Sequence, residues 1–470
     1  MDSKSLPSTD LCEHKEELSD KLQNAPEDML EDNDLGDDKQ YSQLLRKLDR
    51  RIIPILAVLY LLSFLDRGSI GNANIQGLSK DLHLVGNQYN WCLTVFFFPY
   101  CFFEPLCNAL LIKLRPSIWL PSIMVAWGVI MTLTGIVQGY SGLLAARFFL
   151  GLTEAGLFPG ITFYVSLWYT RADAQFRLAM VFASASVAGA FSGLLAYLIV
   201  KMDGVGGLHG WRWIFLLEGM LTVVIAISAY WIIPDEPATA RFLRESEKRL
   251  AIARLLHDRP QHNSAGEQHL ESQFKWKYVR AAFTDWQTIF HCLGYWGNGV
   301  AVYAISLFLP TIINGLGYTA EHAQLLTVPI YTAAAITCIM VGYYSDHTQQ
   351  RSLFIMLSFT FPGLLTLSSN NYAPSAKRAT GMAIQIGFGT MGGAAASNFY
   401  HKPDAPRYRL GHSLVLGFNV LSMLCMGSYY LICRHINKKR AVEYADTHTQ
   451  YSDEQLHDMG DKAPNYRYTL

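Results

Sequence analysis

The stretch that decides the fold is residues 142–169, which read GLLAARFFLGLTEAGLFPGITFYVSLWY. Arg147 and Glu154 are its only charged residues. A helix rises about 1.5 Å per residue, so a run of this length exceeds the hydrocarbon thickness of a bilayer, about 30 Å. The stretch therefore predicts a helix that crosses a membrane and carries two ionisable groups inside it.

Similar apolar runs recur along the 470-residue chain, in which 51% of the residues are hydrophobic and 16% are charged. This composition is too apolar for a soluble protein of several domains. The runs lie at about 52–76, 89–112, 118–138, 142–169, 177–200 and 212–233, and then at 286–313, 325–344, 352–368, 378–400 and 411–433. The sequence therefore predicts an all-α polytopic membrane protein in two halves.

Charged residues gather outside these runs, although the formal net charge is zero. Residues 1–45 are acidic and lack the basic start and apolar core of a signal peptide, which predicts a disordered cytosolic tail. We expect a first bundle at 46–234, a basic cytosolic linker at 235–285, a second bundle at 286–433 and a cytosolic tail at 434–470. Basic residues before the first run and in alternate loops place both termini in the cytosol.

The residue types that mark an enzyme or a nucleic-acid-binding protein do not cluster in the sequence. Seven of the eight cysteines lie in or beside apolar runs without the paired spacing of a metal site, which favours buried small hydrophobic side chains. No motif for a catalytic metal or a nucleophile stands out. We therefore expect no cofactor, no metal, no enzymatic activity and no nucleic-acid partner.

Ionisable residues inside the apolar runs mark where function should be sought, because a charge at the bilayer centre costs at least about 2.5 kcal/mol. Five stand out, namely Asp66, Arg67, Glu104, Arg147 and Glu154. Arg67 lies near mid-depth in the first run, and its planar guanidinium suits a bidentate grip on a substrate carboxylate. The alternative is a structural ion pair with Asp66 or another acid.

Arg147 and Glu154 lie seven residues apart, so two helical turns place them on nearly the same face, as a linked charge pair. In an apolar, glycine-lined setting, desolvation favours the protonated form of Glu154 and lets it exchange a proton near neutral pH. Glu154 and Asp66 are therefore the candidates for proton coupling, and Arg147 is a candidate for substrate binding. The alternatives are a permanent salt bridge for Glu154 and a snorkelling interfacial side chain for Arg147.

Further polar and aromatic side chains complete the candidate site. Tyr164 and Trp296 could stack on a flat substrate ring, and the amide of Asn298 could bind substrate. Packing, interface anchoring and contacts between helices are the alternative roles for these three residues. Glu104 and Glu218, which are followed by Pro and Gly, are either functional or structural acids at kinks.

Several motifs resemble those of a known transporter family. The segment GYYSDH (342–347) with Arg351 resembles the cytosolic-loop signature of the major facilitator superfamily, and RFFLGLTEAG (147–156) resembles its fourth-span motif. The blocks RFFLGLTEAGLFPG (147–160) and GWRWIFLLEG (210–219) are similar to those of the fungal anion:cation symporters. That family includes permeases for allantoate, pantothenate and nicotinate, and MDGVGG (202–207) looks most like the nicotinate branch.

The resemblance covers about residues 45–440 and implies the major facilitator fold of two six-helix bundles with a site between them. It implies a monomeric, multi-pass transporter of the plasma membrane that moves a small organic carboxylate together with protons. By resemblance, Arg67 would bind substrate, and Asp346 and Arg351 would belong to a cytosolic gating loop.

The second half departs from the family pattern, because it supplies five apolar runs where members have six spans. The run at 352–368 joins two loops that both look cytosolic, and a single crossing cannot do this. We expect that it does not cross as one ordinary helix and that about 40 residues, one hairpin's worth, are absent here. A non-transporting sensor or an inactive truncated paralogue is therefore the alternative to a transporter.

Overall fold

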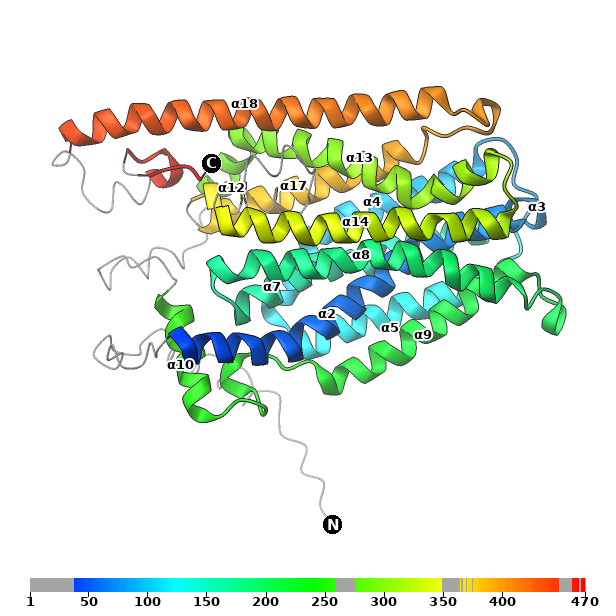
Figure 1. Ribbon diagram of the computed structural model, residues 1–470, viewed down its shortest axis with the longest axis horizontal. Helices are drawn as coiled ribbons and strands as arrows, with labels where there is room; N and C mark the ends of the chain where they lie inside the picture. The colour runs from blue at the N-terminus through cyan, green and yellow to red at the C-terminus, as the bar shows by residue number, and fades with distance from the viewer. Residues whose placement is uncertain are drawn as a thin grey trace, which may run out of the picture.

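The computed structural model describes residues 38–257, 276–348, 364, 367–368, 370–373, 375–447, 459–464 and 466–469. Within these ranges the chain is helical and contains no strand. Figure 1 shows the long helices side by side, with the short helix α3 at one end of the molecule and α10 and α12 at the other. We refer to these as the α3 end and the α10 end.

The first half and the linker are built from one continuous series of helices. They are α2 (Asp38–Ile75), α3 (Leu78–Asp81), α4 (Gln88–Lys113), α5 (Pro116–Thr134), α6 (Tyr140–Glu154), α7 (Leu157–Trp168), α8 (Arg171–Val200), η3 (Val205–Gly207), α9 (Gly210–Ile232), η4 (Pro237–Thr239) and α10 (Glu245–His257). The second half contains α12 (Trp276–Thr284), α13 (Trp286–Gly315), α14 (Ala320–Thr348), α17 (Ser375–Ala396), η5 (Lys402–Asp404), α18 (Arg409–Thr447) and η6 (Gly460–Lys462).

These helices coincide with the predicted apolar runs. Seven segments of the described chain are long and apolar enough to cross a membrane, and α2, α4 and α17 cover three further runs. The all-α polytopic fold predicted from the sequence is therefore confirmed. The run at 352–368 lies almost entirely outside the described residues, so the expectation about it stays a prediction.

The first helix begins earlier than predicted. Residues 1–45 were expected to form a disordered tail, but α2 starts at Asp38. Its first turns bury Leu48, and Lys47 forms an ion pair of 2.6 Å with Glu247 on α10. This amphipathic start is helical because it packs against the linker helix, a contact between segments 200 residues apart that the local sequence does not reveal.

The fourth predicted run is a pair of helices, α6 and α7, that adjoin near Ala155. Pro159 has no N–H and cannot donate to the Ala155 carbonyl one turn earlier, so the helix is interrupted there. Glu154 ends α6 at this break. One turn before it, Gly151 lies against the Phe96 carbonyl of α4, where an added Cβ would overlap the backbone. The break and the close approach together carry Glu154 into the centre of the molecule.

In the part of the chain that the structure describes, the two halves meet chiefly through α8 against α14, α4 against α17 and α2 against α13. Near the α3 end, Asn90 on α4 donates to the Ser397 carbonyl at 2.7 Å, and Asn398 donates to the Thr94 hydroxyl at 2.9 Å. Gly71 on α2 lies directly against the Leu307 carbonyl of α13. Direct packing and hydrogen bonds therefore join the halves at the α3 end.

The last described residues, 459–464 and 466–469, fold back onto the second half and are called here the C-terminal strap. Asp461 accepts from Lys377 at 2.7 Å and from Gln287 at 2.5 Å, and Lys377 also contacts Asp285. The predicted cytosolic tail at 434–470 is thus not free: α18 continues to Thr447 and the strap is packed. A buried lysine needs counter-charges, and the strap supplies one of two.

We predict that Asp461→Ala lowers the thermal stability of the purified protein in detergent. The change removes one of two anions from a buried lysine and one acceptor from Gln287, a loss of about 1–3 kcal/mol. Lys462→Ala, at the exposed neighbouring position, is the matched control. Equal midpoints of thermal unfolding for the two variants would show that the strap does not stabilise the second half.

Candidate functional site

An ion pair between Arg67 and Glu154 occupies the centre of the molecule. Arg67 Nε lies 2.7 Å from Glu154 Oε1, and the two side chains are only 8% and 1% exposed. The Ser63 hydroxyl donates to the same carboxylate oxygen. Arg67 Nη1 also donates to the Tyr303 hydroxyl at 3.0 Å. Because Tyr303 belongs to α13, Arg67 links the two halves.

Aromatic rings surround the guanidinium group of Arg67. Its central carbon lies 5.0–5.8 Å from four ring centroids, those of Phe64, Phe96, Tyr100 and Tyr303. At these distances the ring faces attract a cation and replace part of the hydration that burial removes. The arrangement therefore holds a charged guanidinium in an apolar setting.

A small cavity of about 20 Å³ adjoins Arg67. Its walls come from both halves and are mainly aromatic, consisting of Tyr60, Phe64, Arg67, Tyr100, Phe158, Phe182, Tyr295, Val302, Tyr303, Ile386 and Thr390. This volume suffices for about one water molecule. The site is therefore closed around its own side chains in this conformation.

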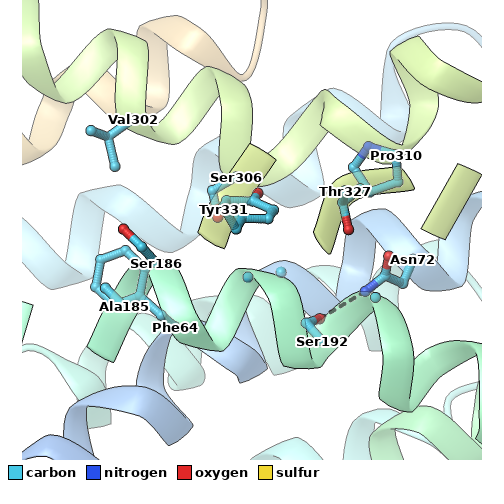
Figure 2. A pocket seen from close by; sticks show the side chains of 13 residues that line it. Phe64, Asn72, Ala185, Ser186, Ser192, Val302, Ser306, Pro310, Thr327 and Tyr331 are labelled. Carbon is cyan, nitrogen blue, oxygen red and sulfur yellow. Dashed lines mark hydrogen bonds between the residues drawn. The ribbon is translucent and has the colours of Figure 1, made fainter. Parts of the chain in front are cut away.

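A second cavity, of about 70 Å³, lies beside the first toward the α3 end and shares Phe64 and Val302 with it. Figure 2 shows hydroxyl groups of α8 on one side and of α13 and α14 on the other. The walls include Asn72, which donates to Ser192 at 2.7 Å, and no charged residue. This neutral, hydrogen-bonding space has room for a few water molecules next to the charged cavity.

Asp66 points away from both cavities, into the first half. Its Oδ2 accepts from Trp127 Nε1 of α5 at 2.6 Å and from the Thr222 hydroxyl of α9 at 3.2 Å. Among the described residues, its Oδ1 has no hydrogen-bond partner. The structure therefore places this candidate for proton coupling behind Arg67 rather than in the same cavity.

Arg147 neither pairs with Glu154 nor snorkels to the membrane interface. In the described chain it forms no ion pair with Glu154, because seven residues separate the two by about 10.5 Å along the helix. It does not snorkel either, since it is only 3% exposed and lies over the Phe215 ring at 5.7 Å. Its Nε and Nη2 atoms are buried without a hydrogen-bond partner among the described residues.

The structure separates Tyr164 and Trp296 from the cavities. The Tyr164 hydroxyl donates to the Pro234 carbonyl at 2.5 Å, near the α10 end. Trp296 packs within the second half, 4.7 Å from Phe388 between ring centroids. The ring that lines the cavity is the adjacent Tyr295. Tyr295 and Trp296 are adjacent in sequence, but neighbouring positions on a helix differ in direction by about 100°. The two rings therefore point to different sides of α13.

Asn298 is buried, and its Nδ2 atom has no partner in the described chain. It shares a helix face with Tyr295 and Val302, which are spaced three and four residues away and line the cavities. Of the two predicted gating residues, Asp346 lies within α14 rather than in a loop. Arg351 lies outside the described residues.

One part of the site that sequence reasoning missed has a recognisable signal. Tyr60, Ser63, Phe64 and Arg67 follow one another at spacings of three, one and three residues, which places them on one face of α2. Such a polar and aromatic stripe is unusual in a membrane span and indicates the cavity-facing side. Tyr295 offers no comparable signal, since its contacts depend on α13 meeting the first half.

Two helical halves that enclose a charged, aromatic-lined site are the architecture of secondary transporters. The sequence profile described as the Major Facilitator Superfamily matches residues 56–428. The chain belongs to this superfamily, as its motifs predicted, and its members are transporters rather than enzymes.

Relatives and solved structures agree with this assignment. The chain is 35% identical to the MFS-type transporter cnsO of Penicillium expansum, over 91% of this chain and 90% of that protein. It is 30% identical to a high-affinity nicotinic acid transporter of Saccharomyces cerevisiae, over 91% of this chain and 84% of that protein. The crystal structure of a D-xylose–proton symporter shares the fold with a TM-score of 0.54, at 12% identity, over 80% of this chain and 96% of that one.

The first of these alignments also bears on the length of the chain. It runs over 474 positions yet spans 91% of a chain of 470 residues, so several tens of its positions stand opposite gaps in this chain. This agrees with the expectation that part of the relatives' chain is absent here.

We predict that Arg67 and Glu154 are strongly coupled in a double-mutant cycle. Arg67→Ala and Glu154→Ala each leave a buried charge without its partner, at a cost of about 3–5 kcal/mol. The double variant leaves no unpaired charge, so its loss of thermal stability should be clearly smaller than the sum of the two. Additive losses would show that the two residues do not act as a pair.

Proposed function

We propose that the protein is a proton-coupled symporter of a small organic carboxylate, with nicotinate as the first substrate to test. The observation that carries the proposal is a buried arginine, in an aromatic-lined cavity between the halves, that is bound to a single carboxylate. A relative named as a nicotinic acid transporter supports this choice of substrate.

Substrate binding would exchange one carboxylate for another on Arg67. The guanidinium group has a planar fork that fits a carboxylate in bidentate geometry, while Glu154 occupies it through Nε. The aromatic walls, including Tyr100 and Tyr303, suit a flat ring attached to the carboxylate. The cavity must open for this, because its present volume does not hold such a molecule.

The exchange couples substrate to proton. Once displaced from Arg67, Glu154 is a buried carboxylate whose one remaining donor among the described residues is the Ser63 hydroxyl, so it binds a proton from the open side. Arg67 is then neutralised by the substrate anion, and Glu154 carries the proton. When the substrate leaves on the other side, Glu154 gives up its proton and returns to Arg67. One proton therefore accompanies one carboxylate at this pair.

The orientation follows from charge. The basic residues that precede the first span lie at the α10 end, which the positive-inside rule places in the cytosol. We propose a monomer in the plasma membrane, with both termini cytosolic and Asp66 as an additional acid behind the site.

A non-transporting sensor or inactive paralogue is the second candidate, and the gaps relative to the longer relatives favour it. A sensor would bind a carboxylate at Arg67 without moving it. Uptake of a labelled panel of nicotinate, pantothenate and allantoate into a transport-null cell, at two external pH values, separates the two. Faster uptake of one member at the lower pH supports symport, and saturable binding without uptake supports the sensor.

We predict that Glu154→Gln abolishes concentrative uptake, because glutamine keeps the shape of the side chain but cannot carry a proton. The measurement is the steady-state ratio of internal to external substrate. Glu245→Gln, on the exposed surface of α10, is the control and should behave like the unaltered protein. A Glu154→Gln variant that still concentrates substrate would contradict a coupling role.

We also predict that Arg67→Lys impairs uptake nearly as much as Arg67→Ala. Lysine keeps the charge but loses the planar fork, and it cannot contact Glu154 and Tyr303 in the same geometry. Arg241→Lys, at an exposed position of the linker, is the matched control. Near-normal uptake by Arg67→Lys would mean that the arginine acts only as a diffuse positive charge.

A further inference from the structure

The first half buries more carboxylates than cations in its membrane segments. The buried ionisable residues of its described spans are four acids and two arginines, namely Asp66, Glu104, Glu154, Glu218, Arg67 and Arg147. If all were ionised, the region would carry two uncompensated negative charges away from water. Such charges are expensive in a low-dielectric interior, so some of the acids must hold protons.

Hydrogen bonds distinguish among the acids. Glu154 has Arg67 and Ser63 as donors, and Asp66 and Glu218 each contact at least one donor group. Glu104 is 0% exposed, and neither of its carboxylate oxygens has a hydrogen-bond partner among the described residues. An ionised carboxylate without a donor is the least tolerable state in this setting, so Glu104 is the acid that holds a proton in this conformation.

The position of Glu104 on α4 links this proton to the contact between the two halves. Four residues earlier in α4 contact α17, or the two residues that directly follow it, in the other half: Asn90, Thr94, Phe97 and Cys101. They are spaced by four, three and four residues, and Glu104 follows three residues later on the same stripe. We call these contacts the α4–α17 seam. The last of them is the Cys101 thiol donating to the Gly387 carbonyl at 3.0 Å.

The groups that face Glu104 can be named helix by helix. Arg67 on α2 is the cation whose charge acts on it, and α13 contributes the hydroxyls of Tyr295 and Tyr303. Its own helix brings the Tyr100 hydroxyl and the Cys101 and Cys107 thiols.

The neighbouring helices α17 and α7 contribute no counter-ion to Glu104. On α17, Lys377 is bound by Asp285 and Asp461, and Arg378 donates to the Tyr372 carbonyl. The described helix α7 contains no charged residue. The cation that acts on Glu104, Arg67, is already paired to Glu154, so opening the seam to water is the change that would stabilise ionised Glu104.

We propose that Glu104 is a second proton-binding site of the transporter, protonated while the α4–α17 seam is closed and ionised when the seam opens to water. The proposal deepens the proposed symport and rests on it. A proton on Glu104 favours the closed seam, because a neutral acid can be buried, and its release favours the open one.

The proton on Glu104 follows the seam rather than the substrate. Glu104 takes up a proton each time the seam closes and releases it each time the seam opens, on the loaded and on the unloaded leg of the cycle. The two legs therefore cancel, and the cycle keeps the one proton per carboxylate that Glu154 carries. What Glu104 adds is a pH dependence of seam opening, which glutamine at this position removes.

The first test uses purified protein in liposomes with labelled nicotinate, or the panel member that is taken up. Substrate counterflow, which needs no net proton movement, should persist in Glu104→Gln and shows that the variant is folded. An inside-negative potassium diffusion potential should leave uptake by both proteins unaffected, because one proton per carboxylate is electroneutral.

A second test needs no substrate and reads the seam through Cys101. In a chain that retains Cys101 as its only cysteine, alkylation by N-ethylmaleimide is measured at about pH 6 and about pH 8, with and without Glu104→Gln. Ionisation of the thiol is common to both proteins, so their rate ratio isolates the effect of Glu104. If the seam opens when Glu104 ionises, the alkylation rate of the unaltered protein divided by that of the variant should grow several-fold from about pH 6 to about pH 8.

Distinct outcomes overturn the two proposals. Uncoupler-insensitive uptake by the unaltered protein would contradict proton symport itself. Proton-driven uptake together with a pH-independent alkylation ratio would overturn only the role of Glu104. If Glu104→Gln does not fold, Glu104→Ala takes its place in the same ratio.

Discussion

The ion pair between Arg67 and Glu154 is the interaction on which the rest of the structure depends. A guanidinium group at mid-depth in a membrane protein needs a counter-ion, and only a neighbouring helix can provide it. The break between α6 and α7, set by Pro159, places the end of α6 beside α2. The aromatic rings and the Tyr303 hydroxyl complete the environment of the cation. Helix geometry, charge compensation and the contact between halves therefore meet at one pair.

A site between two halves works only if each half is a stable unit and the contact between them is reversible. Close backbone approaches such as Gly71 against Leu307, together with the asparagine hydrogen bonds, join the halves tightly at the α3 end. The second half is tied together differently, by the C-terminal strap and the buried Lys377. In a chain with gaps relative to its relatives, this strap supplies contacts that hold α13, α17 and α18 together.

Much of the fold could be predicted from the sequence because it depends on local properties. The length of an apolar run determines whether a helix can cross a bilayer, and the distribution of basic residues indicates its direction. The cost of a buried charge singled out Arg67, Glu104 and Glu154 before any contact was known. Helix ends were less predictable, since α2 extends to Asp38 only because a linker helix packs on it.

Which residues would meet was decided by the tertiary structure alone. The sequence placed Arg147 and Glu154 on one helix face, but two turns separate them, and Arg67 from another helix is the partner. Asp66 and Arg67 are adjacent in sequence, but Asp66 contacts side chains of the first half and Arg67 reaches the second half. The reason is that successive side chains on a helix diverge by about 100°. The sequence by itself determined that charges lie inside a helical membrane protein. Their pairing required the packing of distant helices, because partner choice depends on which faces meet.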